Sequence, residues 1–198
     1  MARPPRFDTG QLLDAAVRLA ADGGPAAVTM AAVAQAVGAP SGSVYHRFAG
    51  RTALLAEVWL RTTEHFQEGC TAALGSDPDP VRAACATARY VVAWSRAHPE
   101  EAAVLLYGAR DFGRAEWSAE HTARAESGNT RLFAAVAALA EALGATDDPA
   151  RERLTLALVD LPMSLVRRHV RGGRPLPPYA EDLTEQCTAA LLRDMHAV

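Results

Sequence analysis

The amino-acid sequence predicts an all-α protein of about nine helices. Apolar residues recur at helical spacing along almost the whole chain, and no segment shows the strict apolar–polar alternation of a half-buried strand. Clusters of glycine and proline, such as residues 75–80 and 172–178, separate the helical segments. The chain has 198 residues, of which 49% are hydrophobic, so it can form a sizeable core and a disordered chain is excluded.

Three short helices are expected near the N-terminus, over residues 8–23, 29–37 and 40–48. Asp8 and Gln11 have the spacing of a capping box at the start of the first helix. Thr29 is a suitable cap for the second helix, and Gly38 is a suitable end for it. Pro40 suits the first position of the third helix.

The rest of the chain predicts longer helices. The stretch Asp147-Asp148-Pro149 is expected to cap the second-last of them, and Pro162 inside that helix predicts a kink. The expected ranges are 52–74, 81–97, 99–107, 116–143, 147–171 and 179–196.

The residue types present exclude several kinds of chemistry. Because the chain contains no lysine, a Walker-type phosphate loop, a Schiff-base lysine and a Ser-x-x-Lys nucleophile are all excluded. There is no Gly-x-Ser-x-Gly string, and the six histidines form neither a His-x-x-x-His nor a Glu-x-x-His pair. We therefore expect no enzymatic activity, no metal site and no cofactor.

The cysteines and the apolar runs indicate that the protein is in the cytoplasm. Cys70, Cys85 and Cys187 are odd in number and widely spaced, which favours reduced thiols over disulfides. No apolar run approaches the roughly 18 residues that a membrane-spanning helix needs. The N-terminal residues contain no apolar region typical of a signal peptide. We expect a cytoplasmic protein that makes no membrane contact.

The second and third helices, joined by a tight turn, have the spacing of a helix-turn-helix. In that motif the later helix enters the major groove of DNA, while the earlier helix crosses the phosphate backbone. The outward side of the later helix, named here the reading face, would carry Ser41, Gly42, Ser43, Tyr45 and His46. These side chains allow a close approach to DNA, and none of them is long and acidic.

Residues 29–48, followed by Arg51 and the pair Leu54-Leu55, resemble the tetracycline-repressor (TetR) family of bacterial transcription regulators. The matching features are an initiating Thr29, a stretch that ends in Gly38, a Tyr-x-x-Phe segment and a basic residue three positions later. The resemblance implies an N-terminal DNA-binding domain, residues 1–51, and a ligand-binding and dimerisation domain, residues 52–198. Pro40 and Arg51 depart from the serine and lysine that are frequent in the family, and Ser41 stands where many members have lysine.

The resemblance also implies which residues contact DNA: Thr29, Ser43, Tyr45, His46 and Arg51. Ser41 and Gly42 share the reading face with them, and Arg47 lies beside it. Arg51 and Thr29 at helix N-termini would contact phosphates, whereas Ser43 and His46 are better placed to contact base edges. The alternatives are that Tyr45 packs in the core, and that His46 is only a solvated side chain.

The charge distribution agrees with a DNA-binding N-terminus. Residues 1–51 contain five arginines and three aspartates, a net charge of +2, whereas the remaining residues carry −5. Arg3 and Arg6 form a short basic arm that could reach the phosphate backbone or the minor groove, and the alternative is a non-specific tail.

The middle helices are where this family binds small molecules, and this stretch is rich in aromatic residues. An apolar or aromatic effector is therefore expected there, although the same side chains would also suit an ordinary core. The candidate ligand-binding residues are Trp59, Phe66, Tyr90, Trp94, Tyr107, Phe112, Trp117 and Met163.

The last two helices predict a homodimer, through residues of about 150–171 and 179–196. The first of them has two apolar stripes, which indicates burial on two sides. One stripe is Leu154, Leu158, Leu161 and Leu165, and the other is Leu156, Val159, Met163 and Val166. In the last helix Leu183, Cys187, Leu191 and Met195 are in line. The alternative is a monomer with a large core.

These features together predict a dimeric regulator that binds a palindromic double-stranded DNA operator through residues 29–51 and is released by a small molecule. The expected role is that of a repressor. One alternative is a DNA-binding dimer without a small-molecule effector. Another is a helical ligand-binding protein with a vestigial DNA module.

Overall fold

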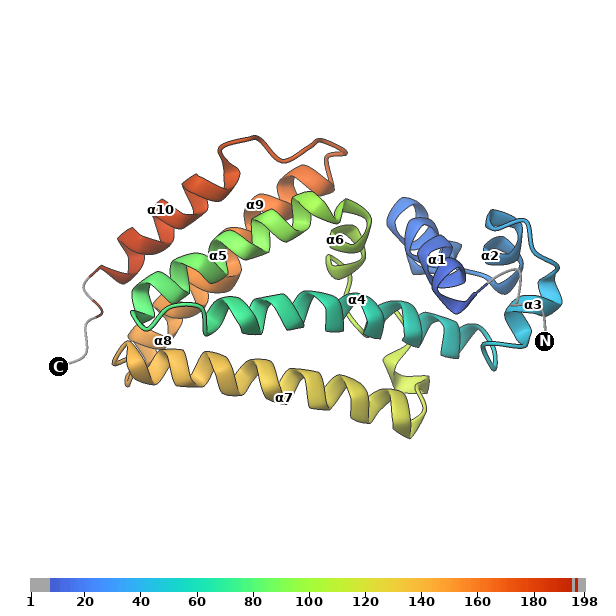
Figure 1. The fold of residues 1–198 in the computed structure, drawn as a ribbon, viewed down its shortest axis with the longest axis horizontal. Helices are drawn as coiled ribbons and strands as arrows, with labels where there is room; N and C mark the ends of the chain where they lie inside the picture. Colours follow the sequence, from blue (N-terminus) through green and yellow to red (C-terminus); the bar gives the residue numbers. More distant parts are fainter. Residues whose placement is uncertain (1–7, 194, 196–198) are drawn as a thin grey trace, which may run out of the picture. The chain divides into compact units, whose positions relative to one another are not determined.

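The computed structural model describes residues 8–193 and residue 195 (Figure 1). These residues contain helices and no strand, which confirms the all-α fold. The helices are α1 (Thr9–Gly23), α2 (Met30–Ala36), α3 (Ser41–Tyr45), α4 (Arg51–Leu74), α5 (Pro80–Ala97), α6 (Pro99–Leu105), α7 (Ala119–Ala142), α8 (Asp148–Thr155), α9 (Leu161–Val170) and α10 (Ala180–Leu192). Short 3₁₀ turns lie at Pro25–Ala27 and Arg114–Glu116. The predicted basic arm, Arg3 and Arg6, lies outside the described residues.

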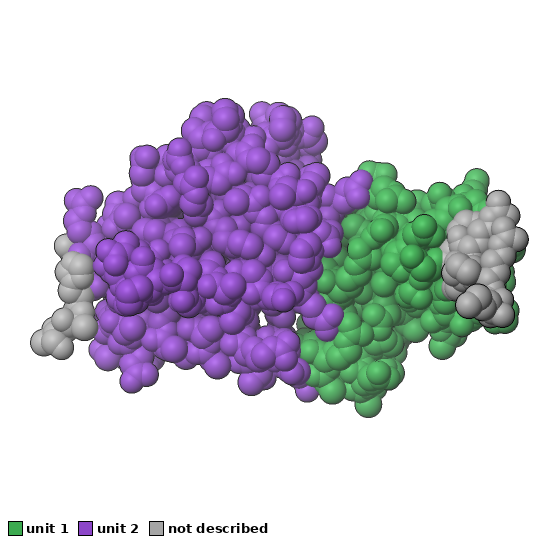
Figure 2. All heavy atoms as spheres, in the orientation of Figure 1, with its two compact units in different colours: residues 1–63, 103–125 green, residues 64–102, 126–198 purple. Residues whose placement is uncertain are grey.

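The chain forms two compact units (Figure 2). Unit 1 comprises residues 1–63 and 103–125, and unit 2 comprises residues 64–102 and 126–198. Helix α4 therefore contributes its first half to unit 1 and its second half to unit 2. The compact units differ from a division at residue 51, and the functional division at that residue stays a prediction.

Unit 1 has a core to which the three N-terminal helices contribute. Leu12 of α1, Val33 of α2 and Val44 of α3 are fully buried in it, together with Leu54 of α4. The predicted capping box at the start of α1 is present: the Gln11 backbone N–H donates to Asp8 Oδ1 at 2.7 Å, and the Asp8 N–H donates to Gln11 Oε1 at 3.3 Å.

In unit 2, α5 packs against both α9 and α10 (Figure 1). The helix predicted over residues 147–171 is continuous but irregular, because residues Leu156–Asp160 form a π-helical turn between α8 and α9. Pro162, the second residue of α9, lacks the N–H that would continue the α-helical hydrogen bonding. The structure thus has a π turn just before Pro162, and the kink itself stays a prediction.

The helix predicted over 116–143 begins later than expected. Residues Arg114–Glu116 form a 3₁₀ turn instead, and Ser118 precedes α7, where its hydroxyl accepts a hydrogen bond from the His121 N–H at 3.2 Å. This side-chain cap satisfies one of the free N–H groups in the first turn. Among the described residues, no helix is long and apolar enough to cross a membrane.

Arg96 on α5 binds both the first turn of α10, through an ion pair, and the segment before α10, through a backbone carbonyl. Arg96 Nε and Nη2 donate to the two carboxylate oxygens of Glu181, both at 2.7 Å, and Arg96 Nη1 donates to the Leu176 carbonyl at 2.6 Å. The guanidinium lowers the pKa of Glu181 below its ordinary value of 4.5. The pair therefore stabilises the fold fully above that pH, and its contribution disappears as the pH falls through the lowered pKa.

We expect Glu181→Gln to cost about 1 kcal/mol or less near pH 7, since the pair is partly exposed. The loss should shrink as the pH falls below the ordinary glutamate value of 4.5. Thermal unfolding of both proteins across this pH range measures it. A stability difference that does not change with pH would contradict the electrostatic origin.

Candidate nucleic-acid interface

The turn between α2 and α3 is fixed by Gly38. This residue has a φ of 67°, in the left-handed region that favours glycine. Its N–H donates to the Gln35 carbonyl at 3.1 Å, and the next N–H, of Ala39, donates to the Ala34 carbonyl at 2.9 Å. These two bonds form a Schellman motif, which ends α2 and directs the chain into α3.

Helix α3 is oriented by its buried side. Val44 is fully buried, and Phe48, just beyond the helix, is 4% exposed. Pro40 is the N-cap residue, so it precedes the helix rather than occupying the expected first position. The buried pair faces the core of unit 1, and the opposite side of α3 therefore faces outward.

The predicted reading face is exposed in the structure. Tyr45 is 61% exposed, and Ser41, Gly42 and His46 are exposed as well. Ser43 is half-buried. The exposure of Tyr45 is contrary to the alternative that this side chain packs in the core. A large aromatic side chain in water at this position is available to contact DNA.

Thr29 caps α2 as the sequence predicts. Its Oγ1 accepts a hydrogen bond from the Ala32 N–H at 3.0 Å, and the residue is exposed. Because the oxygen is the acceptor in this bond, the hydroxyl hydrogen can still be donated to a phosphate oxygen. Arg47, half-buried beside the reading face, donates from Nη1 to the Ser43 carbonyl at 3.0 Å.

Arg51 has a structural contact that the sequence did not reveal. As the first residue of α4, it donates from Nε to the Val28 carbonyl at 2.8 Å and from Nη2 to the Pro25 carbonyl at 2.7 Å. The guanidinium therefore joins the start of α4 to the segment that leads into α2. The sequence indicated only a phosphate contact for Arg51, because carbonyls more than 20 residues away leave no local signal.

We expect Arg51→Ala and Arg51→Lys both to cost about 1–2 kcal/mol of stability. Lysine keeps the positive charge but cannot donate to two carbonyls in the geometry of the guanidinium fork. Thermal unfolding measures the loss, and Arg18→Lys, at an exposed position on α1, is the matched control. Unchanged stability of Arg51→Lys would show that the two carbonyl contacts contribute nothing.

The candidate ligand-binding residues fall into two groups. In unit 1, Phe112 packs against Trp59 with ring centroids 5.3 Å apart, and Trp117 Nε1 donates to the Phe112 carbonyl at 2.9 Å. Tyr107 also lies against Phe112. Phe112 and Trp117 are buried members of the core there. Phe112 and Trp117 therefore agree with the alternative that these aromatic side chains form an ordinary core.

In unit 2, Phe66 packs against Tyr90 and Trp94, with ring centroids 5.8 Å and 5.2 Å apart. Burial raises the pKa of Tyr90 to about 12, so its hydroxyl stays protonated, and it donates to the Phe66 carbonyl at 3.1 Å. Trp94 is buried, yet its Nε1 has no hydrogen-bond partner among the described residues. Met163 lies half-buried on α9.

Comparison with known proteins connects this geometry to a family. Residues 12–58 match the family model described as bacterial regulatory proteins, tetR family. The matched segment includes most of α1, all of α2 and α3, and the start of α4. A search of curated proteins gave no match.

Solved structures match over nearly the whole chain. The TetR-family regulator PfmR from Thermus thermophilus has a TM-score of 0.70 at 19% identity, covering 98% of this chain and 100% of the other. FadR from Bacillus subtilis, solved with stearoyl-CoA, has a TM-score of 0.71 at 14% identity, with coverages of 96% and 100%. The ketosteroid regulator KstR2 of Mycobacterium tuberculosis has 0.69 at 18% identity, with coverages of 100% and 99%. The chain therefore has the fold of these regulators.

Proposed function

We propose that this chain, which has the TetR fold and the family's helix-turn-helix segment at its N-terminus, is a dimeric repressor that binds a palindromic operator. The observation that carries this proposal is the reading face of α3. Ser41, Tyr45 and His46 on this face are exposed and Ser43 is half-buried, while Val44 and Phe48 on the opposite side anchor the helix against the core. A short helix with a polar outer face and a capped helix before it is the arrangement that enters the major groove.

Different residues would serve different contacts. Thr29 and Arg51 would contact phosphate oxygens and so position the module on DNA. Ser43 and His46 would contact base edges, since a hydroxyl and an imidazole can both donate and accept hydrogen bonds. Ser41 and Gly42 are small enough to allow a close approach, Tyr45 would pack on the sugar–phosphate backbone, and Arg47 would add charge beside the groove.

A mobility-shift experiment tests DNA binding directly. The probe is the DNA upstream of the protein's own gene, with a shuffled sequence of the same composition as the control. We expect a shift with the natural DNA at lower protein concentration than with the shuffled DNA. Equal affinity for both probes would overturn sequence-specific binding. Because few arginines face the DNA, the salt dependence should be modest per subunit.

Dimerisation is proposed from apolar side chains that unit 2 leaves exposed. Val159 in the π turn between α8 and α9 is 51% exposed, and Leu183 on α10 is 43% exposed. The side of α10 that faces the core contains Thr184 and Thr188, and the Thr188 hydroxyl donates to the Ala157 carbonyl at 3.2 Å. α10 also buries Ala180 and Leu192, but Leu183 remains outside the core, and together with Val159 it leaves apolar surface in water. A second copy would bury it.

The two apolar stripes predicted over residues 150–171 differ in how much of each is exposed. Leu154, Leu158 and Leu165 are buried within unit 2. Of the second stripe, Leu156 and Val159 are exposed, whereas Val166 is buried. The exposed pair lies at the π turn and supplies the outer contact in the proposed dimer. Two subunits related by a two-fold axis would then present two reading helices to the two halves of a palindrome.

A small-molecule effector is proposed for unit 2. Trp94 packs against Phe66, and its buried Nε1 has no partner among the described residues. Because buried N–H groups ordinarily have a partner, this group would suit a mostly apolar ligand with one acceptor group. Binding would move α4, which begins at Arg51 directly after the helix-turn-helix. A coupling of about 1–3 kcal/mol would weaken DNA binding roughly 5–150-fold.

Thermal-shift measurements with acyl-CoAs and steroids test the effector, since solved relatives include a stearoyl-CoA complex and a ketosteroid regulator. A ligand that binds the folded state should raise Tm. The same ligand should not stabilise Trp94→Phe to the same extent. If DNA binding is specific and neither class of ligand raises Tm, the protein is a regulator without an effector of these classes. The packing of Phe112 and Trp117 in the core of unit 1 agrees with that alternative.

A further inference from the structure

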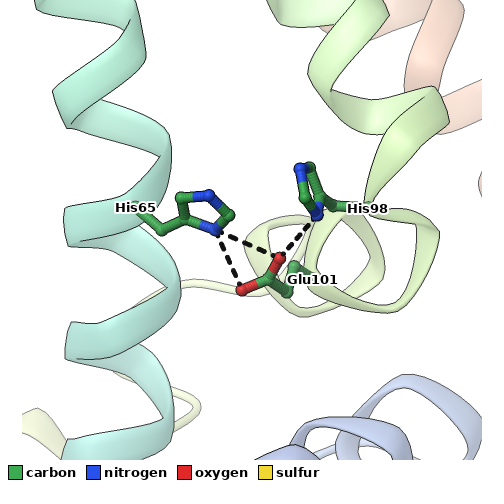
Figure 3. A group of neighbouring side chains, drawn as sticks. All are labelled: His65, His98 and Glu101. Carbon is green, nitrogen blue, oxygen red and sulfur yellow. Dashed lines mark hydrogen bonds and ion pairs between the residues drawn. The ribbon is translucent and has the colours of Figure 1, made fainter.

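Three residues that are far apart in the sequence meet in unit 2: His65 on α4, His98 at the end of α5, and Glu101 on α6 (Figure 3). The Glu101 carboxylate lies between the two imidazoles. His65 Nδ1 is 3.3 Å from Glu101 Oε2, and His98 Nδ1 is 3.2 Å from the same oxygen. The three ligand-type atoms all lie within 4.8 Å of one another.

Local structure fixes the positions of His98 and Glu101. The His98 N–H donates to the Trp94 carbonyl at 2.8 Å, which ends α5, and its carbonyl accepts from the Ala102 N–H at 2.8 Å, which starts α6. Because Pro99 is the first residue of α6, Glu101 is the third, and this spacing places the two side chains on the same side of the helix start.

Aromatic contacts hold the imidazoles. The Trp94 ring centroid is 5.1 Å from that of His98 and 5.6 Å from that of His65, and the two imidazole centroids are 4.7 Å apart. The Glu101 side chain is only 15% exposed, and its ion-pair partners among the described residues are these two histidines. A shielded carboxylate without an arginine partner favours a cation at this position.

We propose that His65 Nδ1, His98 Nδ1 and a Glu101 carboxylate oxygen bind a zinc-type divalent cation. Two imidazoles and a carboxylate are a common zinc ligand set that leaves a fourth position for water. Bonds of about 2.0–2.1 Å in a tetrahedral site place neighbouring ligand atoms about 3.3 Å apart. The nitrogen-to-oxygen distances of 3.2 Å and 3.3 Å match two of the three edges, and the third, between the two nitrogens, lies within 4.8 Å.

The sequence did not indicate this site. The patterns considered were His-x-x-x-His and Glu-x-x-His, whereas this chain has the reverse order, His98-x-x-Glu101, and the third ligand is on another helix. The competing explanation is a hydrogen-bonded cluster without a metal, in which each imidazole N–H donates a hydrogen bond to the Glu101 carboxylate. Metal binding discriminates between the two explanations. In a coordinating site the ion replaces the N–H protons through which the imidazoles bind Glu101.

The experiment titrates the full-length protein, without DNA, with Zn²⁺ by calorimetry and with Co²⁺ by tryptophan fluorescence. We expect one Zn²⁺ per chain, and quenching by paramagnetic Co²⁺ that is lost in Trp94→Phe, because the Trp94 ring adjoins both imidazoles. His98→Gln and Glu101→Gln should each weaken Zn²⁺ binding more than about 10-fold. His65→Asn, at an exposed position, should do the same without risk to the fold.

The matched control is His121→Gln. His121 Nε2 is 3.1 Å from Glu57 Oε1, so it is also an imidazole bonded to a carboxylate, but there the second partner is Arg124 rather than a histidine. This variant should bind Zn²⁺ as the wild type does. The proposal is overturned if the wild type binds no Zn²⁺, if His121→Gln weakens binding as much as His98→Gln, or if Cys187→Ser removes it. None of these outcomes depends on DNA binding, so the proposed function is tested separately.

Discussion

Replacing Tyr45 or His46 with alanine is expected to weaken operator binding by about 10–100-fold each, without loss of the fold. One lost contact to a base or to the backbone costs about 1–3 kcal/mol. The fold should be unaffected because Tyr45 is 61% exposed and His46 is exposed too, so neither supports the core of unit 1. Mobility shifts measure affinity, and thermal unfolding measures stability.

The control for Tyr45→Ala is Phe133→Ala on α7. Phe133 is also a highly exposed aromatic residue, at 67%, but it lies in unit 2. Phe133 lines the same surface hollow as Val159, so light scattering must show that Phe133→Ala stays dimeric. As a dimer, this variant should bind the operator as the wild type does. If Tyr45→Ala and His46→Ala each bind the operator as the wild type does, the reading face is not the DNA contact surface. An equal loss of affinity for operator and shuffled DNA would instead assign these residues to non-specific contacts.

The double variant Val159→Asp, Leu183→Asp is expected to be a monomer. Aspartate on the proposed interface would place two desolvated carboxylates per subunit against the same surface of a second copy, and burial of such unpaired charges is strongly unfavourable. Each subunit should still fold, because both positions are solvent-exposed within a single chain. Light scattering after size-exclusion chromatography measures the mass.

Loss of the dimer should reduce operator affinity by about 10²–10⁴-fold, because a monomer loses the simultaneous contact with two half-sites. Tyr45→Ala is the reciprocal control, since it should weaken DNA binding while the protein stays dimeric. A wild-type protein that is already monomeric, or a double variant that remains dimeric, would contradict an interface through α8–α10. In the second case the exposed apolar side chains would have another role.

The sequence was most informative where structure depends on near neighbours. The caps at Asp8, Thr29 and Asp147 each join a side chain to an N–H three residues away, and all three are present. Such contacts need only the local chain, so residue type and spacing are sufficient to predict them. The same reasoning applies to Gly38, because a left-handed φ after a helix is a local requirement.

Helix ends were less predictable where competing local conformations are close in energy. Residues Arg114–Glu116 form a 3₁₀ turn although the pattern of apolar residues also fits an α-helix. Pro162 indicated a kink, and the structure has a π turn at Leu156–Asp160 just before it. Residue patterns predict the existence of a helix better than its ends and local irregularities.

The all-α fold, the capped helices of the helix-turn-helix and the outward polar side of α3 could be predicted from residue types and spacing, because helical periodicity and caps act within a few residues. Which distant groups meet depended on the tertiary structure. The aromatic residues lie in two separate units. Arg51 donates to the Pro25 and Val28 carbonyls. His65 lies beside His98 and Glu101. These contacts depend on how whole helices pack, and the spacing of residues within one helix does not fix where it lies against another.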